Sequence, residues 1–323
     1  MKRNSALMNI SNKTHSEYLR RIRLALAFIE QNLDQAIRLD DVARASFFSA
    51  YHFHRIFHAL VGETVNDYIS RKRMEKSIRL LMHRSEVSVT EVATAGGFSS
   101  SANFSKAFKL YFGVSPSAIR SPDRNENSKT GKLFSKYGKA FNPQDLYSQF
   151  VTQAIVFDPD KLEEMLMKVR VENRAAQPIA SLSSPRGYEL DSVYETWEKL
   201  FQWGELQGIK TDTQIMYGLC YDNPTITPED KCRYKASIVI NPELNVSSPF
   251  EQSTIPAGKY AIAYYKDDAE KISSFMTELY SNWFCNSGYE PDDYPPIFNY
   301  LNNAREDGYV EMDVCIKVKE LTA

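Results

Sequence analysis

A repeated pattern near the N-terminus constrains the fold of this chain more than any other feature. Segments 39–62 and 89–113 align with a shift of about fifty residues, and the second copy holds one extra residue. The matched positions are mostly apolar or small: Leu39, Val42, Ala43, Phe48, Phe53, Phe57 and Gly62 align with Val89, Val92, Ala93, Phe98, Phe104, Phe108 and Gly113. A repeat of this kind is one supersecondary unit used twice.

Each copy predicts two short helices joined by a tight turn. Apolar and small residues recur three and four apart in the first helix, and a second amphipathic helix follows the turn. The turns fall around Phe47-Phe48 and Gly96-Gly97-Phe98. This is the pattern of a helix-turn-helix, and two in tandem are typical of proteins that read DNA.

The second helix of each copy should bury one stripe and present the other face to DNA. The expected buried stripes are Phe53, Ile56, Phe57 and Leu60, and then Phe104, Phe108 and Tyr111. The expected DNA-binding residues on the outward faces are Tyr51, His54, Arg55, Ser101, Ala102, Asn103 and Lys106; His58 shares the first of these faces. An outward helix face can touch successive base edges in the major groove, while phosphate contacts set the register.

Arg55 is the strongest candidate for reading a base, because a guanidinium can bond both acceptors of guanine. A phosphate contact or a solvated face is the alternative. Asn103 could pair with adenine or bond only its own backbone, and Lys106 is a second plausible reader. His52, His54 and His58 have partial metal-ligand spacing, but no carboxylate or Cys with matching spacing completes a site. No metal or cofactor is expected.

Length and charge divide the chain into two functional parts. At 323 residues, two domains are the prior. Residues 1–124 hold 19 basic and 11 acidic side chains, whereas the remainder holds 20 and 30. A basic module joined to an acidic one indicates a head that binds a polyanion. The four scattered cysteines and the lack of a signal-like or membrane-spanning stretch favour a cytoplasmic protein with no membrane association.

The expected domains follow from these patterns. Residues 1–16 are expected to be flexible, 17–121 to form the all-α DNA-binding domain, 122–161 to be a linker, and 162–321 to form an α+β domain. In the head, Thr64 and Asp67 resemble a capping box that opens a basic bridging helix to about residue 84, and Ser115-Pro116 starts a last short helix.

The second domain reads as two β-α-β-type halves. Strands are expected near 168–171, 215–220, 234–240 and 309–318, and the second half begins with segment 255–260. One helix is expected in each half, over 193–207 and 269–286. Strands with one helix per half suggest that both helices lie on one sheet.

With these residues in view, the head resembles the DNA-binding domain of the AraC/XylS family. The resemblance rests on segments 51–57 and 97–116, which read YHFHRIF and GFSSSANFSKAFKLYFGVSP. The tail is similar to GyrI-like effector-binding domains through segments 255–260 and 307–314. The combination implies a regulator that binds promoter DNA, senses a small effector such as a lipophilic cation, and activates through RNA polymerase. One departure is Phe47, where such turns usually carry Gly or Asn.

Two acids and a set of aromatic residues are the candidate effector site. Glu311 and Asp313 lie two apart on one strand and so share a face, where they would attract a cation. The expected aromatic walls are Tyr188, Tyr217, Tyr221, Tyr260, Tyr264, Trp283 and Tyr300. The alternative is a purely structural role, in which the two acids are solvated and the aromatic residues belong to the hydrophobic core. The rival functions of the tail are a protein-interaction module, as in topoisomerase inhibition, and a small-molecule hydrolase.

Overall fold

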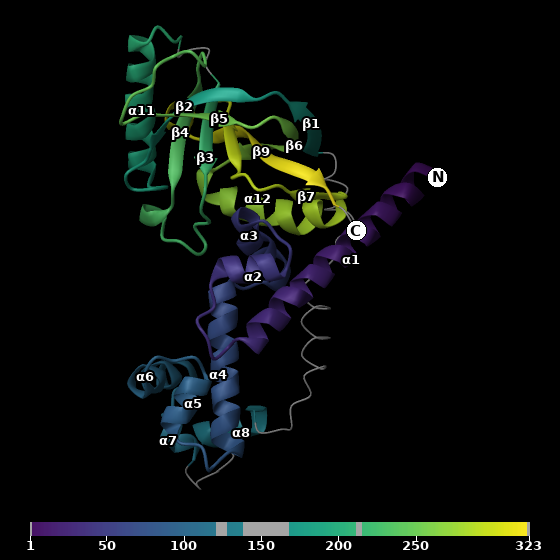
Figure 1. Ribbon diagram of the computed structural model, residues 1–323, viewed down its shortest axis with the longest axis vertical. Helices are drawn as coiled ribbons and strands as arrows, with labels where there is room; N and C mark the ends of the chain where they lie inside the picture. Colours follow the sequence, from purple (N-terminus) through teal and green to yellow (C-terminus); the bar gives the residue numbers. More distant parts are fainter. Residues whose placement is uncertain (1, 121–127, 138–167, 211–214, 322–323) are drawn as a thin grey trace. The chain divides into compact units, whose positions relative to one another are not determined.

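The computed structural model describes residues 2–120, 128–137, 168–210 and 215–321 (Figure 1). The chain forms two compact units, each of which is described by itself. The first contains residues 1–20, 48–60 and 155–323, and the second contains 21–47 and 61–154. The helix-turn-helix that the first sequence repeat predicts is therefore divided between the units. The expected linker, 122–161, lies largely outside the described residues.

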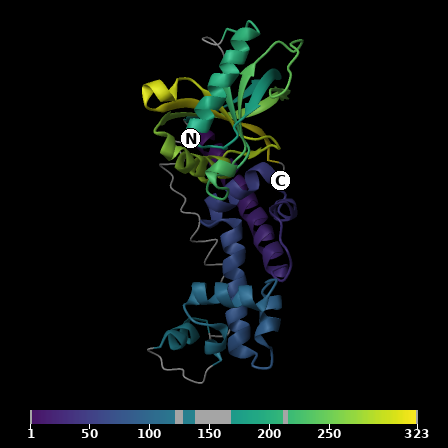
Figure 2. The same ribbon diagram turned by 90° about the vertical axis from the view of Figure 1, so that its left-hand side faces the viewer.

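The second unit is all helical. Its elements are the end of α1 (Lys2–Gln31), then α2 (Leu39–Ala45), α4 (Val65–His83), α5 (Val89–Ala95), α6 (Ser101–Phe112), α7 (Pro116–Ile119) and α8 (Lys129–Tyr137). Figure 2 shows α4 as one continuous helix with α5, α6 and α7 beside its C-terminal part. Their shared core holds Ile78, Val92, Phe104, Phe108 and Ile119, each at most 1% exposed. The second repeat thus folds as the expected helix-turn-helix on α4.

Side-chain caps begin most of these helices where the sequence predicts. Thr64 accepts a hydrogen bond from the Asp67 backbone N–H at 3.1 Å, and Ser115 accepts one from Ala118 at 3.3 Å. Ser88 and Glu91 form a complete capping box at the start of α5. Each cap satisfies a backbone donor that the first helical turn leaves unpaired.

The turns of the two repeats adopt the same left-handed backbone with different residues. Gly97 has φ of +71°, and Phe47 at the matching place has φ of +60°. A Cβ on Gly97 would lie 2.4 Å from the Leu33 carbonyl oxygen, so glycine is required there by space as well as by φ. Phe47 is 66% exposed and holds a conformation that costs an L-residue about 1–2 kcal/mol.

The first unit is built on one antiparallel sheet. Its strands are β1 (Val169–Arg174), β2 (Gln177–Ser183), β3 (Met216–Cys220), β4 (Tyr234–Val239), β5 (Glu251–Ile255), β6 (Gly258–Asp267), β7 (Tyr289–Pro291), β8 (Ile297–Tyr300) and β9 (Val310–Glu320). The order is β1-β6-β9-β8-β3-β4-β2-β5, and β7 also pairs with β9. Strands of the two halves pair at three places: β3 with β8 in the middle of the sheet, β1 with β6 at one end, and β2 with β5 at the other.

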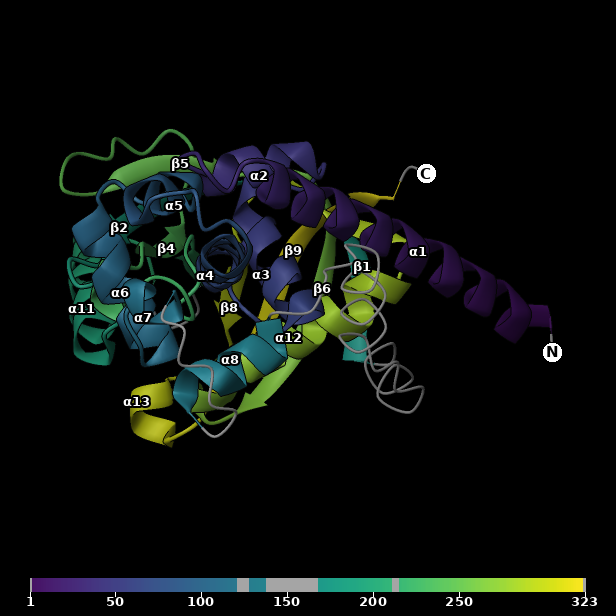
Figure 3. The same ribbon diagram turned by 90° about the horizontal axis from the view of Figure 1, so that it is seen from below.

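Both long helices of this domain lie against the sheet (Figures 1 and 3). They are α11 (Leu190–Leu206) and the segment that begins with α12 (Ile272–Glu278) and continues as single turns to Asn286. Residues that pair directly across strands share a face, so Cys220, Tyr234 and Phe298 lie on one side with Met312 and Val314. Tyr217, Leu219, Ile262 and Cys315 form a core cluster on the other side.

Several sequence-based expectations about the fold differ from the structure. α1 begins at Lys2, so the segment expected to be flexible is helical, and Ser11 donates a hydrogen bond of 2.6 Å to Asn286 in the same unit. Tyr111, expected in the buried stripe of α6, is 47% exposed because Phe104 and Phe108 already fill the core. Strands β2, β5, β7 and β8 were not expected; β7 and β8 have only three and four residues, too few for a clear alternation. No helix in the described part of the chain is long and apolar enough to cross a membrane.

Candidate functional site

A cavity of about 430 Å³ lies in the first unit between α11, α12 and the sheet. The sheet contributes Cys220, Tyr234, Phe298 and Tyr300, and the helical segments contribute Val193, Met276 and Tyr280. Most of this lining is aromatic or aliphatic. A concave, largely apolar cavity with a few polar groups is the usual form of a small-molecule site.

A close approach of backbone and rings shapes the floor of the cavity. A Cβ on Gly218 would lie 2.8 Å from the Tyr234 hydroxyl oxygen and 3.0 Å from the Tyr300 ring. The two tyrosines are linked by a hydrogen bond of 3.3 Å, and the Trp197 indole N–H donates to Tyr234 Oη at 3.0 Å. Glycine on β3 therefore lets the side chains of Tyr234 and Tyr300 approach the backbone of the sheet, and Trp197 is hydrogen-bonded to Tyr234.

The polar lining of the cavity includes hydroxyls and a thiol, beside the charged side chains of Arg55, Asp222, Glu229 and Glu270. Tyr188 donates a hydrogen bond of 2.7 Å to the Asp222 carbonyl oxygen. Burial raises the pKa of Tyr188 well above its ordinary value, and it raises the pKa of Cys220 to about 12. These groups are therefore protonated at neutral pH, and none of them supplies a negative charge for a cationic ligand.

The two acids expected to attract a cation lie on the face of the sheet that the cavity does not occupy. Asp313 pairs with Tyr264 across the strands and receives hydrogen bonds from Arg170, the shorter of 2.7 Å. Glu311 accepts from Tyr264 at 2.6 Å and from Lys266 at 2.9 Å. The expected shared face is confirmed, but both carboxylates already have cationic partners. Their assignment as effector residues stays a prediction.

Two of the seven expected aromatic walls, Tyr188 and Tyr300, line the cavity. Tyr217 and Tyr260 belong to the core of the opposite face, and Trp283 is 3% exposed beside Phe284 and Tyr289. Tyr221 lines a separate depression with Lys235. The sequence reasoning missed Tyr234, Phe298 and Tyr280. Strand alternation could have placed the first two with Tyr300, because the register Cys220–Tyr234 sets that face.

Helix α3 (Ala50–Val61) packs within the first unit against the α+β domain. His52 Nδ1 lies 2.6 Å from the Tyr280 hydroxyl oxygen, and its Nε2 lies 2.9 Å from the Tyr294 carbonyl oxygen. Ser49, just before the helix, donates to Asp293 Oδ1 at 2.9 Å. Arg55 and His58 complete the lining of the cavity. The helix is therefore part of the wall.

This packing corrects the expected exposure of the first outward face. Phe53, Ile56, Phe57 and Leu60 are buried as expected, but His54 is 6% and Arg55 8% exposed. The Arg55 guanidinium donates to the Tyr51 and Asp222 carbonyl oxygens at 3.2 and 2.8 Å. A helix with two buried faces has the same periodicity as one with a free polar face, so the sequence could not show this.

Burial makes both histidines of this interface neutral. Burial first, and then the Arg55 charge, lowers the pKa of His52 to about 3. The same causes hold the pKa of His54 well below its ordinary value, and His54 Nε2 has no hydrogen-bond partner among the described residues. A metal cluster is absent from the described part of the chain.

The corresponding face of α6 in the second unit is open. Ala102, Asn103 and Lys106 are exposed and Ser101 is half-buried, as the sequence predicts. The Asn103 backbone N–H donates to Ser100 Oγ at 3.2 Å and caps the helix. The outward side chains of α6 are thus available to a major groove, although their role in DNA binding stays a prediction.

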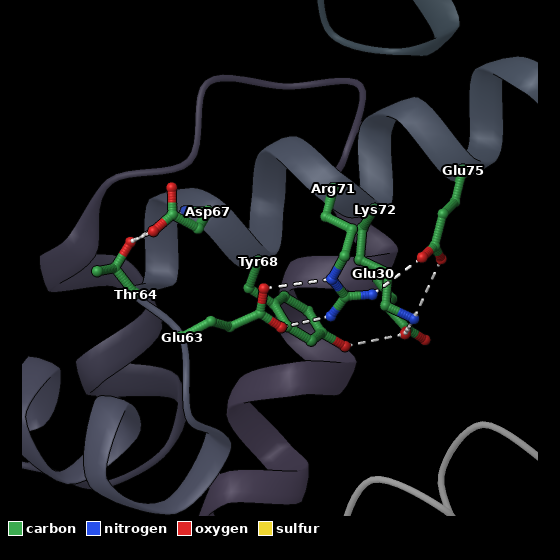
Figure 4. A network of polar contacts seen from close by, with 8 residues as sticks. All are labelled: Glu30, Glu63, Thr64, Asp67, Tyr68, Arg71, Lys72 and Glu75. Atoms are coloured by element: carbon green, nitrogen blue, oxygen red, sulfur yellow. Dashed lines mark hydrogen bonds and ion pairs between the residues drawn. The ribbon is translucent and has the colours of Figure 1, made fainter. Parts of the chain in front are cut away.

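The basic residues of α4 are used within the second unit. Lys72 forms an ion pair with Glu30 at 3.0 Å, and Arg71 forms one with Glu75 at 3.0 Å and another with Glu63 (Figure 4). Arg73 donates to the Leu33 carbonyl oxygen at 2.9 Å. This network fixes α1 and the α3–α4 connection against α4, so these cations contribute to the fold of the head.

Helix-turn-helix elements joined to an α+β domain with an apolar cavity define the class of ligand-responsive DNA-binding regulators. A helix-turn-helix domain model matches residues 42–121, and the model of the GyrI-like small-molecule-binding domain matches residues 167–319. The HTH-type transcriptional activator AarP of Providencia stuartii is 35% identical over 102 residues, which are 32% of this chain and 75% of that protein.

Other known proteins are similar in the same region. The SPbeta prophage-derived transcriptional regulator YosT of Bacillus subtilis is 31% identical over 121 residues, which are 38% of this chain and 80% of that protein. A solved transcriptional regulator of Chromobacterium violaceum with an AraC-type DNA-binding domain is 25% identical, with a TM-score of 0.30, over 32% of this chain and 95% of that one. The chain belongs to the AraC family of transcription regulators and carries a GyrI-like small-molecule-binding domain.

Proposed function

We propose that this regulator takes its effector into the cavity between α11, α12 and the sheet. The observation that supports this most directly is the shape and lining of the cavity, with Tyr188, Tyr234, Tyr280 and Tyr300 around about 430 Å³. Such a space suits an apolar molecule of roughly drug size, held by neutral hydroxyl groups. The cavity does not include Glu311 and Asp313, which form ion pairs with Lys266 and Arg170, and an effector site at these two acids stays the alternative prediction.

Tryptophan fluorescence of the full chain tests this site. Trp197 is bonded to Tyr234 in the cavity floor, whereas Trp203 stacks on Phe250. Titration with N-phenyl-1-naphthylamine, a neutral apolar compound, should quench the protein saturably. The quenching should be lost in Trp197→Phe and retained in Trp203→Phe. Equal quenching in the two variants would place the compound elsewhere on the chain.

DNA binding is proposed to use the outward residues of α6 for sequence choice. Asn103 and Lys106 are exposed on one face of a capped helix, at a spacing that fits a major groove. With a duplex selected by the full chain from a random pool, Asn103→Ala should weaken binding to that duplex and relax one position of the sequence. If Lys106 binds a DNA phosphate, Lys106→Ala should reduce the slope of log affinity against log salt concentration by about one. Unchanged binding in both variants would exclude α6.

The remaining expectations also belong to the proposal. The protein is expected to be cytoplasmic and to bind promoter DNA. Activation of transcription is expected to involve RNA polymerase. A transcription reaction with purified polymerase, the selected duplex upstream of a core promoter and this protein measures that directly. A rise in transcript with the protein supports an activator, and a fall indicates a repressor.

A further inference from the structure

The structure places a helix expected to read DNA inside the wall of the effector cavity. Arg55 and His58 of α3 line the same space as Tyr188, Tyr280 and Tyr300. We propose that α3 is a removable wall with two mutually exclusive partners, DNA and the α+β domain, and that a ligand touching Arg55 holds it in the cavity. The ligand part of this proposal rests on the proposed effector site.

The contacts that hold α3 are made by His52 and by Arg55, and Arg55 belongs to the face expected to read DNA. His52 is bonded at both ring nitrogens, and Arg55 reaches the Asp222 carbonyl oxygen at 2.8 Å. A buried residue cannot reach a base edge or a phosphate. The arrangement of the first unit is therefore one in which the first reading helix is masked, and DNA binding through α3 requires these contacts to break.

Arg55 also indicates the chemistry of a ligand that would stabilise the masked form. Arg55 is only 8% exposed, and the two hydrogen bonds of its guanidinium in the described structure go to backbone carbonyl oxygens. The nearby Asp222 carboxylate is occupied by Arg233, at 2.8 Å from both Nε and Nη2. A guanidinium has five donors, so Arg55 has hydrogen-bonding capacity left.

The favoured ligand is therefore an apolar molecule that carries an anionic or hydrogen-bond-accepting group. Glu229 and Glu270 are also at the cavity, but both are exposed, so water and salt weaken their field more than that of buried Arg55. Because such a ligand contacts both α3 and the domain, it binds the masked form more tightly than the released form. By linkage it lowers affinity for DNA, and DNA lowers its affinity by the same factor.

A reversible crosslink tests the masking without any ligand. Ser49 and Asp293 are hydrogen-bonded at 2.9 Å, and the native cysteines of the chain are all buried. Ser49→Cys with Asp293→Cys, joined through a short thiosulfonate crosslinker, should bind the selected duplex at least tenfold more weakly than the same protein after reduction. Excess duplex added first should slow the crosslinking.

Either of two results would overturn the masking. One is a crosslinked chain that binds the duplex as tightly as the reduced chain, and the other is a pair of cysteines that does not crosslink in the absence of DNA. Folding of each form is checked by the far-ultraviolet spectrum and thermal midpoint. The single variants, treated in the same way, control for modification of one cysteine.

A second pair of variants tests the contact itself. Tyr280→Phe removes the hydroxyl that bonds His52, whereas Tyr265→Phe removes one that bonds the Asp268 carbonyl oxygen inside the domain. If α3 is masked, Tyr280→Phe should tighten binding to the selected duplex about three- to tenfold, the worth of one hydrogen bond, and Tyr265→Phe should not. Equal affinities in wild type and Tyr280→Phe would contradict the proposal.

The ligand chemistry is tested with a matched pair of probes. 1-Anilinonaphthalene-8-sulfonate is the sulfonated form of N-phenyl-1-naphthylamine. Arg55→Ala should weaken binding of the sulfonate at least tenfold and leave the neutral probe within about threefold. If Gly218→Ala weakens binding of both probes but Arg55→Ala weakens binding of neither, the effector site is kept and Arg55 is rejected as its anchor. Binding of neither probe by the wild type would reject the site, while the crosslinking result stands independently.

Discussion

Arg55 Nη2 lies 2.8 Å from the carbonyl oxygen of Asp222, which joins helix α3 to the loop after β3. Tyr188 donates to the same carbonyl oxygen at 2.7 Å. One backbone oxygen thus connects a residue expected to read DNA with a residue of the cavity wall. A displacement of the Asp222 carbonyl oxygen would change the hydrogen bonds of both Arg55 and Tyr188, so the cavity and helix α3 are directly linked.

Arg55 should be needed on DNA once α3 is released. Arg55→Ala is expected to cost about 1–3 kcal/mol on the selected duplex and to relax sequence choice at one position. Fluorescence anisotropy on the selected duplex and on single-base variants measures this. Arg55→Lys keeps the charge but loses the bidentate geometry, so it should retain affinity for random DNA. Equal losses on selected and random DNA would make Arg55 a phosphate contact.

Phe47 should be a site where glycine stabilises the head. Its φ of +60° is strained for a bulky residue, and its side chain is 66% exposed, so little packing is lost on removal. Phe47→Gly is expected to raise the free energy of unfolding by about 1 kcal/mol, because relief of strain exceeds the added chain entropy. Urea unfolding measures it.

The matching position in the second repeat provides the control. Gly97→Ala should be strongly destabilising, because its φ is +71° and the new Cβ would lie 2.4 Å from the Leu33 carbonyl oxygen. A neutral effect of Gly97→Ala, or a loss of stability in Phe47→Gly, would contradict the geometry of these turns.

Gly218 should be required for the cavity. A methyl group there must displace the rings of Tyr234 and Tyr300, which lie 2.8 and 3.0 Å from the position of the Cβ. Gly218→Ala is expected to weaken binding of N-phenyl-1-naphthylamine at least tenfold while the fold is kept. Gly208 is not a suitable control position, because its φ is positive and any side chain there would be strained. The control for altered strand propensity is Ala236→Gly on the neighbouring strand β4. Undiminished binding in Gly218→Ala would place the probe outside this cavity.

Low pH should release α3. The pKa of His52 is lowered to about 3 in the packed helix, against about 6.5 when the ring is in water, so the packing is fully stable above pH 6.5 and weakens as the pH falls below it. At pH 5.5 the expected loss is on the order of 1 kcal/mol. His54 is shifted in the same direction and adds to it.

The groups that face His52 agree with a loss of α3 packing as the pH falls. Arg55 opposes its protonation, Asp292 favours it weakly, and the Tyr280 hydroxyl is neutral because burial raises its pKa. Hydrogen exchange of the α3 amides, corrected for intrinsic rates, should show easier opening at pH 5.5 than at 7.5. His52→Gln should reduce this dependence to the part contributed by His54. A pH-independent opening of α3 in the wild type would reject the prediction.

Local patterns in the sequence determined most of the fold. The signals that specify the second helix-turn-helix lie within its own segment: a Ser88–Glu91 capping box, Gly97 in the turn, and Phe104 and Phe108 on one stripe of a capped helix. Alternation along 234–240 and 309–318 was enough to find central strands of the sheet. These signals are readable because each depends on residues within about one helical turn or one strand pair.

The tertiary structure alone decided where the cavity and the first reading helix lie. Strand register put Tyr234 and Tyr300 on the cavity face and Asp313 on the other. The β3–β8 pair, which places these strands in one sheet, joins residues 78 to 84 positions apart. The burial of Arg55 depends on residues near 222 and 280, which no local pattern connects to α3. Periodicity reports that a helix has two faces, but only the packing of distant segments decides what each face meets.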